Sequence, residues 1–160
     1  MHDRAAALIQ ELQLQPHPEG GYYREIFRSA GSVQPADDRP ARSALTTIYF
    51  LLVEGQQSRW HRVRSDEVWH FYEGDPIEVF WSTGRDAIQK ATLSNGAAGA
   101  RHVCVVPAGD WQAARPAGAY ALVGCTVGPG FDFADFEMIT DGSPEWDALR
   151  RLDGALPELF

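Results

Sequence analysis

Glycine and proline interrupt this chain so often that long helices are excluded over most of its length. The 160 residues include 15 glycines and ten prolines, which follow no period. Both residue types break helices, whereas both are common in the turns between short strands. The distribution therefore predicts a succession of short β-strands.

Apolar and β-branched runs bounded by turn residues mark about eight strands. We expect them at Tyr22–Arg28, Ala44–Val53, Glu67–Tyr72, Ile77–Ser82, Ala87–Leu93, His102–Val106, Tyr120–Val127 and Phe136–Thr140. Helices are predicted over residues 3–14 and from Ser143 onward, and Gly31–Pro40 is predicted to be a mobile loop. Strands without crossover helices favour an antiparallel sandwich or barrel, here as one domain over residues 1–160.

Composition and charge restrict the class of partner. Fourteen Lys and Arg residues against 22 Asp and Glu residues leave a net charge of −8, which repels a nucleic-acid backbone. The apolar run at residues 48–53 is far shorter than the roughly 20 residues of a membrane-spanning helix. We expect no nucleic-acid or membrane partner, a cytoplasmic location, and reduced, buried thiols at Cys104 and Cys125.

One segment carries a recognisable motif. Residues 55–74 read G-x5-H-x-V-x3-E-x6-G, with His61 and Glu67 at two of its fixed positions. This pattern resembles the first motif of the cupin superfamily, in which a second histidine stands where this chain has Val63. Residues 107–112 resemble the second cupin motif, with Gln112 in place of its histidine.

The chain is similar in particular to the cupin subgroup known as DUF985 or cupin_5. The resemblance rests on residues 15–25, 61–72, 106–112 and 129–137, which together span nearly the whole chain. It implies an all-β fold, a cupin jelly-roll β-barrel (double-stranded β-helix) with a short N-terminal helix and a C-terminal helix. It also implies a homodimer, but it does not imply a specific biochemical activity.

Cupins typically bind a divalent transition metal through three imidazoles and one carboxylate. Here Val63 has no lone pair to donate, and Gln112 offers only an amide oxygen, a weak ligand for such metals. We therefore expect a small-molecule pocket without a metal or other cofactor. The alternative is a weak site for a divalent transition metal, built from His61, Glu67 and Gln112.

The alternation of side chains along a strand predicts which residues around the motif face the interior of the barrel. If Glu67 points into the barrel, so do Trp69 and Phe71, whereas His70 faces the other side. His61 is the candidate general base, with Glu67 as the group that orients it. A structural hydrogen bond is the alternative role for His61.

Further ligand-binding candidates are aromatic or acidic. Four tryptophans, Trp60, Trp69, Trp81 and Trp111, can supply a wall for a sugar ring or planar base. Sugar epimerases of the cupin superfamily use a His base with a Tyr acid, and Tyr22, Tyr23, Tyr49 and Tyr120 are available here. The turn at residues 18–21 is either an ordinary structural turn or a lid that places Glu19 or Tyr23 at the mouth of the barrel. The predicted ligand-binding residues are Trp69, Phe71, Trp111, Gln112, Tyr49, Glu19 and Tyr23.

Three functional hypotheses follow. The first is metal-independent proton transfer, as in epimerisation or isomerisation of a sugar nucleotide or a similar anionic metabolite, with His61 as base and Glu67 as its partner. Arg59, Arg62 and Arg64 fit a solvated strand edge, and the alternative is that they bind an anionic ligand. The second hypothesis is a non-catalytic module that binds or senses a metabolite, and the third is a weak metal enzyme.

Overall fold

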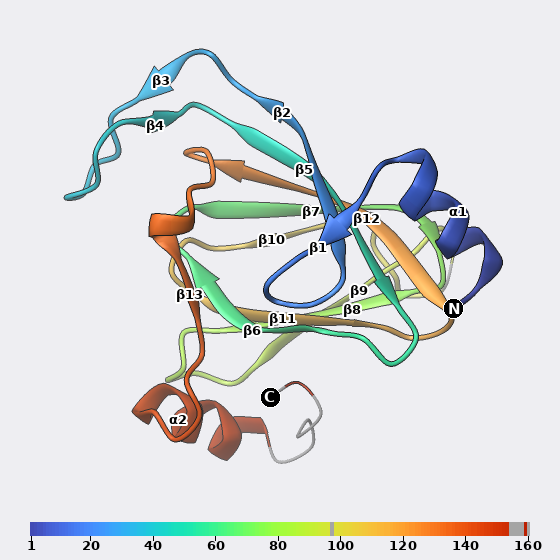
Figure 1. Ribbon diagram of the computed structural model, residues 1–160. Helices are drawn as coiled ribbons and strands as arrows, with labels where there is room; N and C mark the ends of the chain where they lie inside the picture. Colours follow the sequence, from blue (N-terminus) through green and yellow to red (C-terminus); the bar gives the residue numbers. More distant parts are fainter. Residues whose placement is uncertain (97, 154–158, 160) are drawn as a thin grey trace.

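Two antiparallel β-sheets packed face to face make up the body of the computed structural model, which describes residues 1–96, 98–153 and 159 (Figure 1). The larger sheet has the order β1 (Gln15–Pro16), β2 (Tyr22–Arg28), β5 (Thr46–Val53), β12 (Tyr120–Gly128), β7 (Asp66–Gly74) and β10 (Val103–Val106). The smaller has the order β13 (Phe136–Met138), β6 (Ser58–Val63), β11 (Trp111–Pro116), β8 (Ile77–Ser82) and β9 (Gln89–Leu93). A separate hairpin pairs β3 (Ser32–Val33) with β4 (Arg42–Ser43). The predicted all-β jelly-roll barrel is confirmed.

The core lies between the two sheets because each strand turns every second side chain inward. Phe50 and Leu52 of β5, Trp69 of β7 and Val79 of β8 are at most 1% exposed and share one apolar cluster. Glu67 precedes Trp69 by two positions on the same strand and faces the same interior. The alternation predicted for β7 is therefore confirmed.

A helix covers the outer face of each sheet. Helix α1 (Asp3–Glu11) places Leu8 against Leu51 on the larger sheet. Helix α2 (Pro144–Asp153) places Leu149 against two tryptophans on the outer face of the smaller sheet. Both predicted helices are present, and both stabilise the barrel by burying apolar surface that the sheets would otherwise expose.

Two central strands of the smaller sheet, β6 and β11, are absent from the strands predicted by sequence. Strand β6 contains Arg59 and Arg62, and β11 contains three residues of low strand propensity, so neither run is typical of a strand. The tertiary structure supplies partners for the charges: Arg62 lies 4.5 Å from the centre of the Trp111 ring and pairs with Glu137. Pairing with neighbouring strands therefore stabilises β6 and β11 despite their low strand propensity.

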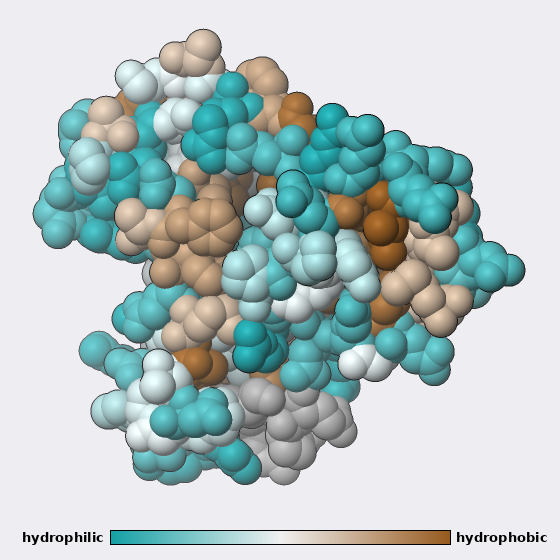
Figure 2. Space-filling model, in the orientation of Figure 1, coloured by the Kyte–Doolittle hydropathy of each residue, from teal (hydrophilic) through white to brown (hydrophobic). Residues whose placement is uncertain are grey.

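The surface in this orientation is mainly hydrophilic (Figure 2). Hydrophobic surface gathers in separate patches over the short 3-10 helix η1 (Phe133–Asp135) and beside α1. Among the described residues, no helix is both long enough and apolar enough to cross a membrane.

Candidate functional site

A cavity of about 440 Å³ lies between the two sheets at one end of the barrel. The strand registers explain its position, because they bring Arg28, Thr46, Glu67 and Val127 to the same end of the larger sheet. Strand β6, the turn before β2 and residues 131–136 complete the wall. A volume of this size fits a small organic molecule.

Two buried carboxyl groups and two buried imidazoles line this cavity. The turn before β2 supplies His17 and Glu19, β6 supplies His61, and β7 supplies Glu67. The side chains of His17, Glu19 and His61 are 7%, 9% and 3% exposed, so their charged forms have lost most of their contact with water. Four titratable groups in one buried pocket are typical of a functional site rather than of a structural core.

Glu19 and His61 form the closest pair in this group. Oε2 of Glu19 lies 3.2 Å from Nε2 of His61, and Nδ1 of His61 donates to the carbonyl oxygen of Arg59 at 2.7 Å. Ser58 donates to Oε1 of Glu19 at 2.9 Å. Burial raises the pKa of Glu19 and lowers the pKa of His61. Glu19 and the carbonyl of Arg59 thus contact the two ring nitrogens of His61, and the charge of Glu67, the predicted partner, also acts on this ring.

Glu67 belongs to a second chain of buried polar contacts. Nε2 of Gln112 donates to Oε2 of Glu67 at 2.5 Å, and the indole Nε1 of Trp69 donates to Oε1 of Gln112 at 3.1 Å. Burial raises the pKa of Glu67 to about 7, and the charge of His61 works against this increase. A carboxyl group with this pKa exchanges a proton readily near neutral pH.

The residues present do not fit the metal that the cupin resemblance implies. Val63 has no donor atom, and the amide oxygen of Gln112, which a metal would need, already accepts the Trp69 indole N–H. Within residues 1–96, 98–153 and 159, no group of three or more His, Cys, Asp or Glu side chains is placed to hold a metal ion. We derive no step through a metal.

The other side of the cavity is aromatic. Tyr23 projects from β2, and Phe131, Phe133 and Phe136 come from the segment around η1. The ring centres of Phe131 and Phe133 are 5.0 Å apart, and those of Phe133 and Phe136 are 6.0 Å apart, so these side chains form one continuous surface. Such a surface can pack against the face of a ring-shaped ligand.

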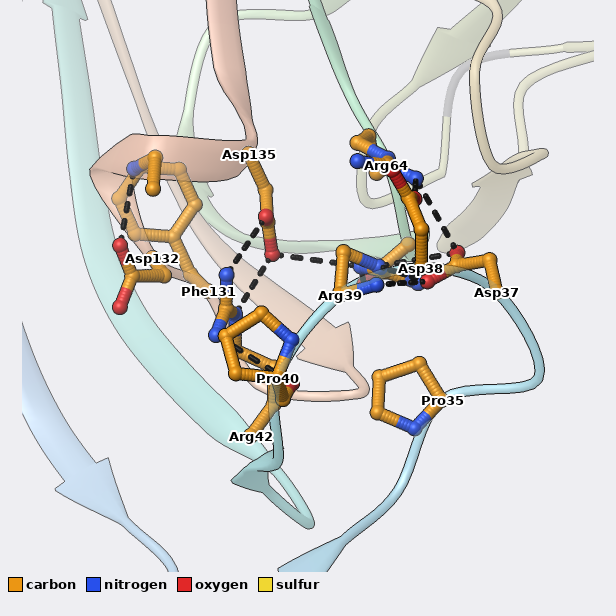
Figure 3. A network of polar contacts seen from close by, with 12 residues as sticks. Pro35, Asp37, Asp38, Arg39, Pro40, Arg42, Arg64, Phe131, Asp132 and Asp135 are labelled. Carbon is orange, nitrogen blue, oxygen red and sulfur yellow. Dashed lines mark hydrogen bonds and ion pairs between the residues drawn. The ribbon is translucent and has the colours of Figure 1, made fainter.

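A buried ion-pair cluster holds this aromatic segment in place (Figure 3). Asp135 lies between Phe133 and Phe136 in sequence and is 5% exposed. Nε and Nη2 of Arg42 each donate to its carboxylate at 2.9 Å, and Nη1 of Arg39 lies 3.3 Å away. Asp135 therefore has a structural role in this segment.

The same cluster changes the interpretation of residues 31–40. Arg39 is 6% exposed and also donates to Asp37 and to Ser65. The expected mobile loop is thus tied to the barrel through a buried guanidinium. The prolines and aspartates of this range predicted a loop, which the structure shows over residues 34–41 between β3 and β4, but they gave no indication of these long-range contacts.

Several predicted site residues lie outside the cavity. Tyr49 faces the outer side of the larger sheet and packs in the cluster beneath α1. Trp111 faces the outer side of the smaller sheet, in the cluster beneath α2. Alternation explains both, because their neighbours Phe50 and Gln112 take the inward positions. Phe71 is in the apolar core but does not line the cavity.

The tryptophans do not assemble into one wall. Trp60 and Trp111 lie beneath α2, whereas Trp69 and Trp81 pack in the core between the sheets. Of the available tyrosines, Tyr23 lines the cavity.

The arginines on either side of His61 also make their contacts outside the cavity. Arg59 donates to the carbonyl oxygen of Pro18, and Arg64 pairs with Asp38. The arginine that does line the cavity is Arg28, which makes a two-point contact with Glu25 at 2.9 and 2.7 Å.

Sequence reasoning missed His17 and the phenylalanines of residues 131–136 as site residues. One signal was available for His17, because it stands between two prolines in the same short turn as Glu19. The phenylalanines lie within residues 129–137, a segment that carries the family resemblance, but their local pattern does not show that they face the cavity.

Comparisons with known proteins agree with this architecture. A family model described as "Cupin superfamily (DUF985)" matches residues 6–139. A hypothetical protein from Leishmania major is 34% identical, with 92% of this chain and 91% of that chain covered and a TM-score of 0.80. A protein from Shewanella oneidensis is 32% identical, with 99% and 92% covered and a TM-score of 0.79. No curated protein matches.

A dTDP sugar isomerase from Desulfovibrio desulfuricans G20 shares the fold at a greater distance. It is 13% identical, 78% of this chain and 85% of that chain are covered, and the TM-score is 0.55. At this identity the likeness concerns the fold alone.

Proposed function

Because this chain belongs to the DUF985 family of the cupin superfamily, we propose that it binds a small organic molecule in its barrel cavity and transfers a proton to and from it without a metal. Epimerases and isomerases of carbonyl compounds perform this reaction. The observation that carries the proposal is Glu67, a buried carboxyl group that lines the cavity and whose pKa is raised to about 7. A general base is most effective when its pKa is close to the working pH.

Glu67 is the base in this proposal. Its carboxylate takes a proton from the carbon next to a ligand carbonyl, and the electron pair moves toward the carbonyl oxygen to form an enolate. Return of the proton to the other face of the same carbon gives an epimer. Where that carbon bears a hydroxyl group, transfer of the hydroxyl proton to the enolate oxygen and return of the carbon-bound proton to the neighbouring carbon gives an isomer. A positioned base of this kind contributes about 10²–10⁴-fold to the rate.

His61 has a supporting role in the same scheme. Both of its ring nitrogens face protein oxygens, the carbonyl of Arg59 and the carboxyl of Glu19, so neither is directed at a ligand. This placement favours Glu67 over His61 as the base. The Glu19–His61 pair lies close enough to Glu67 for their charges to interact: burial lowers the pKa of His61, and the charge of Glu67 works against this decrease.

The lining of the cavity favours a ring-shaped, uncharged ligand portion, such as a sugar-like ring. The phenylalanines of residues 131–136 offer apolar faces, and hydroxyl groups can reach Glu25, Arg28 and Asp132. Arg28 is already paired with Glu25, and Asp132 adds a further carboxylate. An anionic group would thus meet no unpaired cation among the described residues that line the cavity.

The test begins with mass spectrometry of small molecules that copurify with the protein. The compound recovered, and dihydroxyacetone as a defined hydroxyketone probe, are then incubated with the protein in deuterated water. We expect deuterium at the carbon next to the carbonyl, at a rate that rises with pH through about 7 as Glu67 loses its proton. Glu67→Gln should abolish this exchange.

The matched control is Glu54→Gln, because Glu54 is exposed and lies outside this cavity. Exchange that is unchanged in Glu67→Gln would remove Glu67 as the base. Absence of exchange in the wild-type protein with both compounds would contradict the catalytic proposal.

A non-catalytic binding module is the second candidate. It is favoured by the same placement of His61, whose two nitrogens are engaged within the protein. In that case one metabolite is retained tightly and reversibly, and the wild-type protein exchanges none of its carbon-bound protons.

A further inference from the structure

His17 is a second imidazole in the cavity and has no role in the scheme above. It lies in the turn between β1 and β2, and its side chain is 7% exposed. Its ring makes an edge contact with Tyr23, with the ring centres 4.5 Å apart, and it stacks at an angle of 24° to Phe133. The ring is therefore held in one orientation on the aromatic side of the cavity.

The hydrogen bonds assign the position of the ring proton. The backbone N–H of Glu19 donates to Nδ1 of His17 at 3.3 Å, so Nδ1 carries the lone pair. Oε2 of Glu19 lies 3.4 Å from the same nitrogen, but it faces His61 more closely, at 3.2 Å. In the neutral ring the proton is then on Nε2. Burial lowers the pKa of His17, which keeps the ring neutral near pH 7.

Nε2 of His17 is not fully enclosed by protein atoms. It has no hydrogen-bond partner within the described part of the chain, and it is not one of the fully enclosed polar atoms that lack a partner there. Since His17 lines the cavity and its side chain is only 7% exposed, the cavity accounts for the space open to Nε2. An N–H group that points into a buried cavity is a preorganised donor for a ligand oxygen.

We propose that His17 is a catalytic hydrogen-bond donor, which binds the ligand carbonyl oxygen through its Nε2–H while Glu67 takes the neighbouring carbon-bound proton. This inference rests on the proposed function. In the step the C–H bond breaks, an O–H bond forms on Glu67, and the electron pair becomes the negative charge of an enolate oxygen. That oxygen accepts the hydrogen bond from His17, and the reverse step restores both residues, so no oxidant or reductant is needed.

A neutral imidazole suits this role when the base is a carboxylate. It stabilises the oxygen charge without donating a full positive charge to the site, so it does not lower the basicity of Glu67 as an imidazolium would. Removal of one such donor typically costs about 10²–10³-fold in rate.

Two variants separate a catalytic role from a structural one. In His17→Asn the amide oxygen can still accept from the Glu19 backbone N–H, but nothing reaches the position of Nε2. In His17→Gln the longer amide can place an N–H near that position. With dihydroxyacetone we expect deuterium exchange to fall about 10²–10³-fold in His17→Asn and by less than about tenfold in His17→Gln. His102→Asn, which changes an exposed histidine outside the cavity, is the control.

A measurement on the free protein tests the proton position without any ligand. Nitrogen-15 NMR of the histidine rings should show His17 as the neutral Nε2–H form near pH 7. A proton on Nδ1, or a doubly protonated ring, would overturn the inference whatever the exchange results. Equal exchange in wild type and His17→Asn would also overturn it, and so would equal losses in His17→Asn and His17→Gln. If the NMR result is as expected but wild type catalyses no exchange, the proposed function fails, and the catalytic role of His17 fails with it.

Discussion

Replacing Glu67 with glutamine should make the folded protein more stable at alkaline pH, and the gain should disappear in acid. Burial raises the pKa of Glu67 to about 7 from an ordinary value of 4.5. A group whose pKa is higher in the folded state destabilises that state as pH rises through the two values. The pKa difference corresponds to about 3 kcal/mol near pH 8 and to less than about 1 kcal/mol near pH 4.5.

Glutamine is the right replacement because it keeps the shape of the protonated acid. Its amide oxygen can still accept from Nε2 of Gln112, and no buried charge forms at any pH. The groups that face Glu67 are Glu19, His61, Gln112 and Cys125, and all four are unchanged in the variant. The difference in stability therefore isolates the cost of ionising position 67.

Urea unfolding followed by circular dichroism at several pH values measures this difference directly. We expect the stability difference between Glu67→Gln and wild type to increase by about 2–3 kcal/mol from pH 4.5 to pH 8. Glu54→Gln should show no such pH dependence, because Glu54 is exposed. A difference that is the same at both ends of the pH range would refute the reasoning. A stabilised but inactive variant would indicate that the buried acid is retained for function.

Two further changes test how the cavity is built. Asp135→Asn should destabilise the protein by about 3–5 kcal/mol in urea unfolding, because it leaves two buried arginines without their shared carboxylate, whereas exposed Asp141→Asn should change little. Gly21→Ala should cost more than Gly109→Ala by about 1–3 kcal/mol. Both glycines have positive φ, but an added Cβ at position 21 would lie 2.7 Å from the carbonyl oxygen of Leu51, and at position 109 it would meet nothing within 4 Å. Equal melting temperatures for the two alanine variants would contradict this explanation.

Local patterns in the sequence were sufficient for most of the fold. Apolar and β-branched runs bounded by turn residues predicted strands such as Tyr22–Arg28 and Ile77–Ser82 with the bounds that the structure has. Alternation from Glu67 also placed Trp69 on the inner side of the barrel, because the side-chain period of a strand depends only on the backbone. The motif around His61 and Glu67 located one side of the pocket through its resemblance to the first cupin motif.

Strands without a clear pattern required the tertiary structure. Ser58–Val63 and Trp111–Pro116 carry arginines or small residues, and they become strands because neighbouring strands satisfy their backbone groups. The apolar residues on their outer faces are buried only because α2 covers them. Trp111 beneath α2 therefore could not be distinguished from a pocket residue by its place beside Gln112.

What the sequence by itself determined is the β-rich class, the inward direction of Glu67 and the absence of a second motif histidine at Val63. Only the tertiary structure decided which groups meet. Glu19 reaches Ser58 across 39 residues of chain, and Arg42 reaches Asp135 across 93. Local spacing says nothing about contacts at such separations, because they depend on how the sheets and turns close around the cavity. The chemistry of this site, with Glu67 raised to a pKa of about 7, follows from burial, and burial is a property of the assembled barrel.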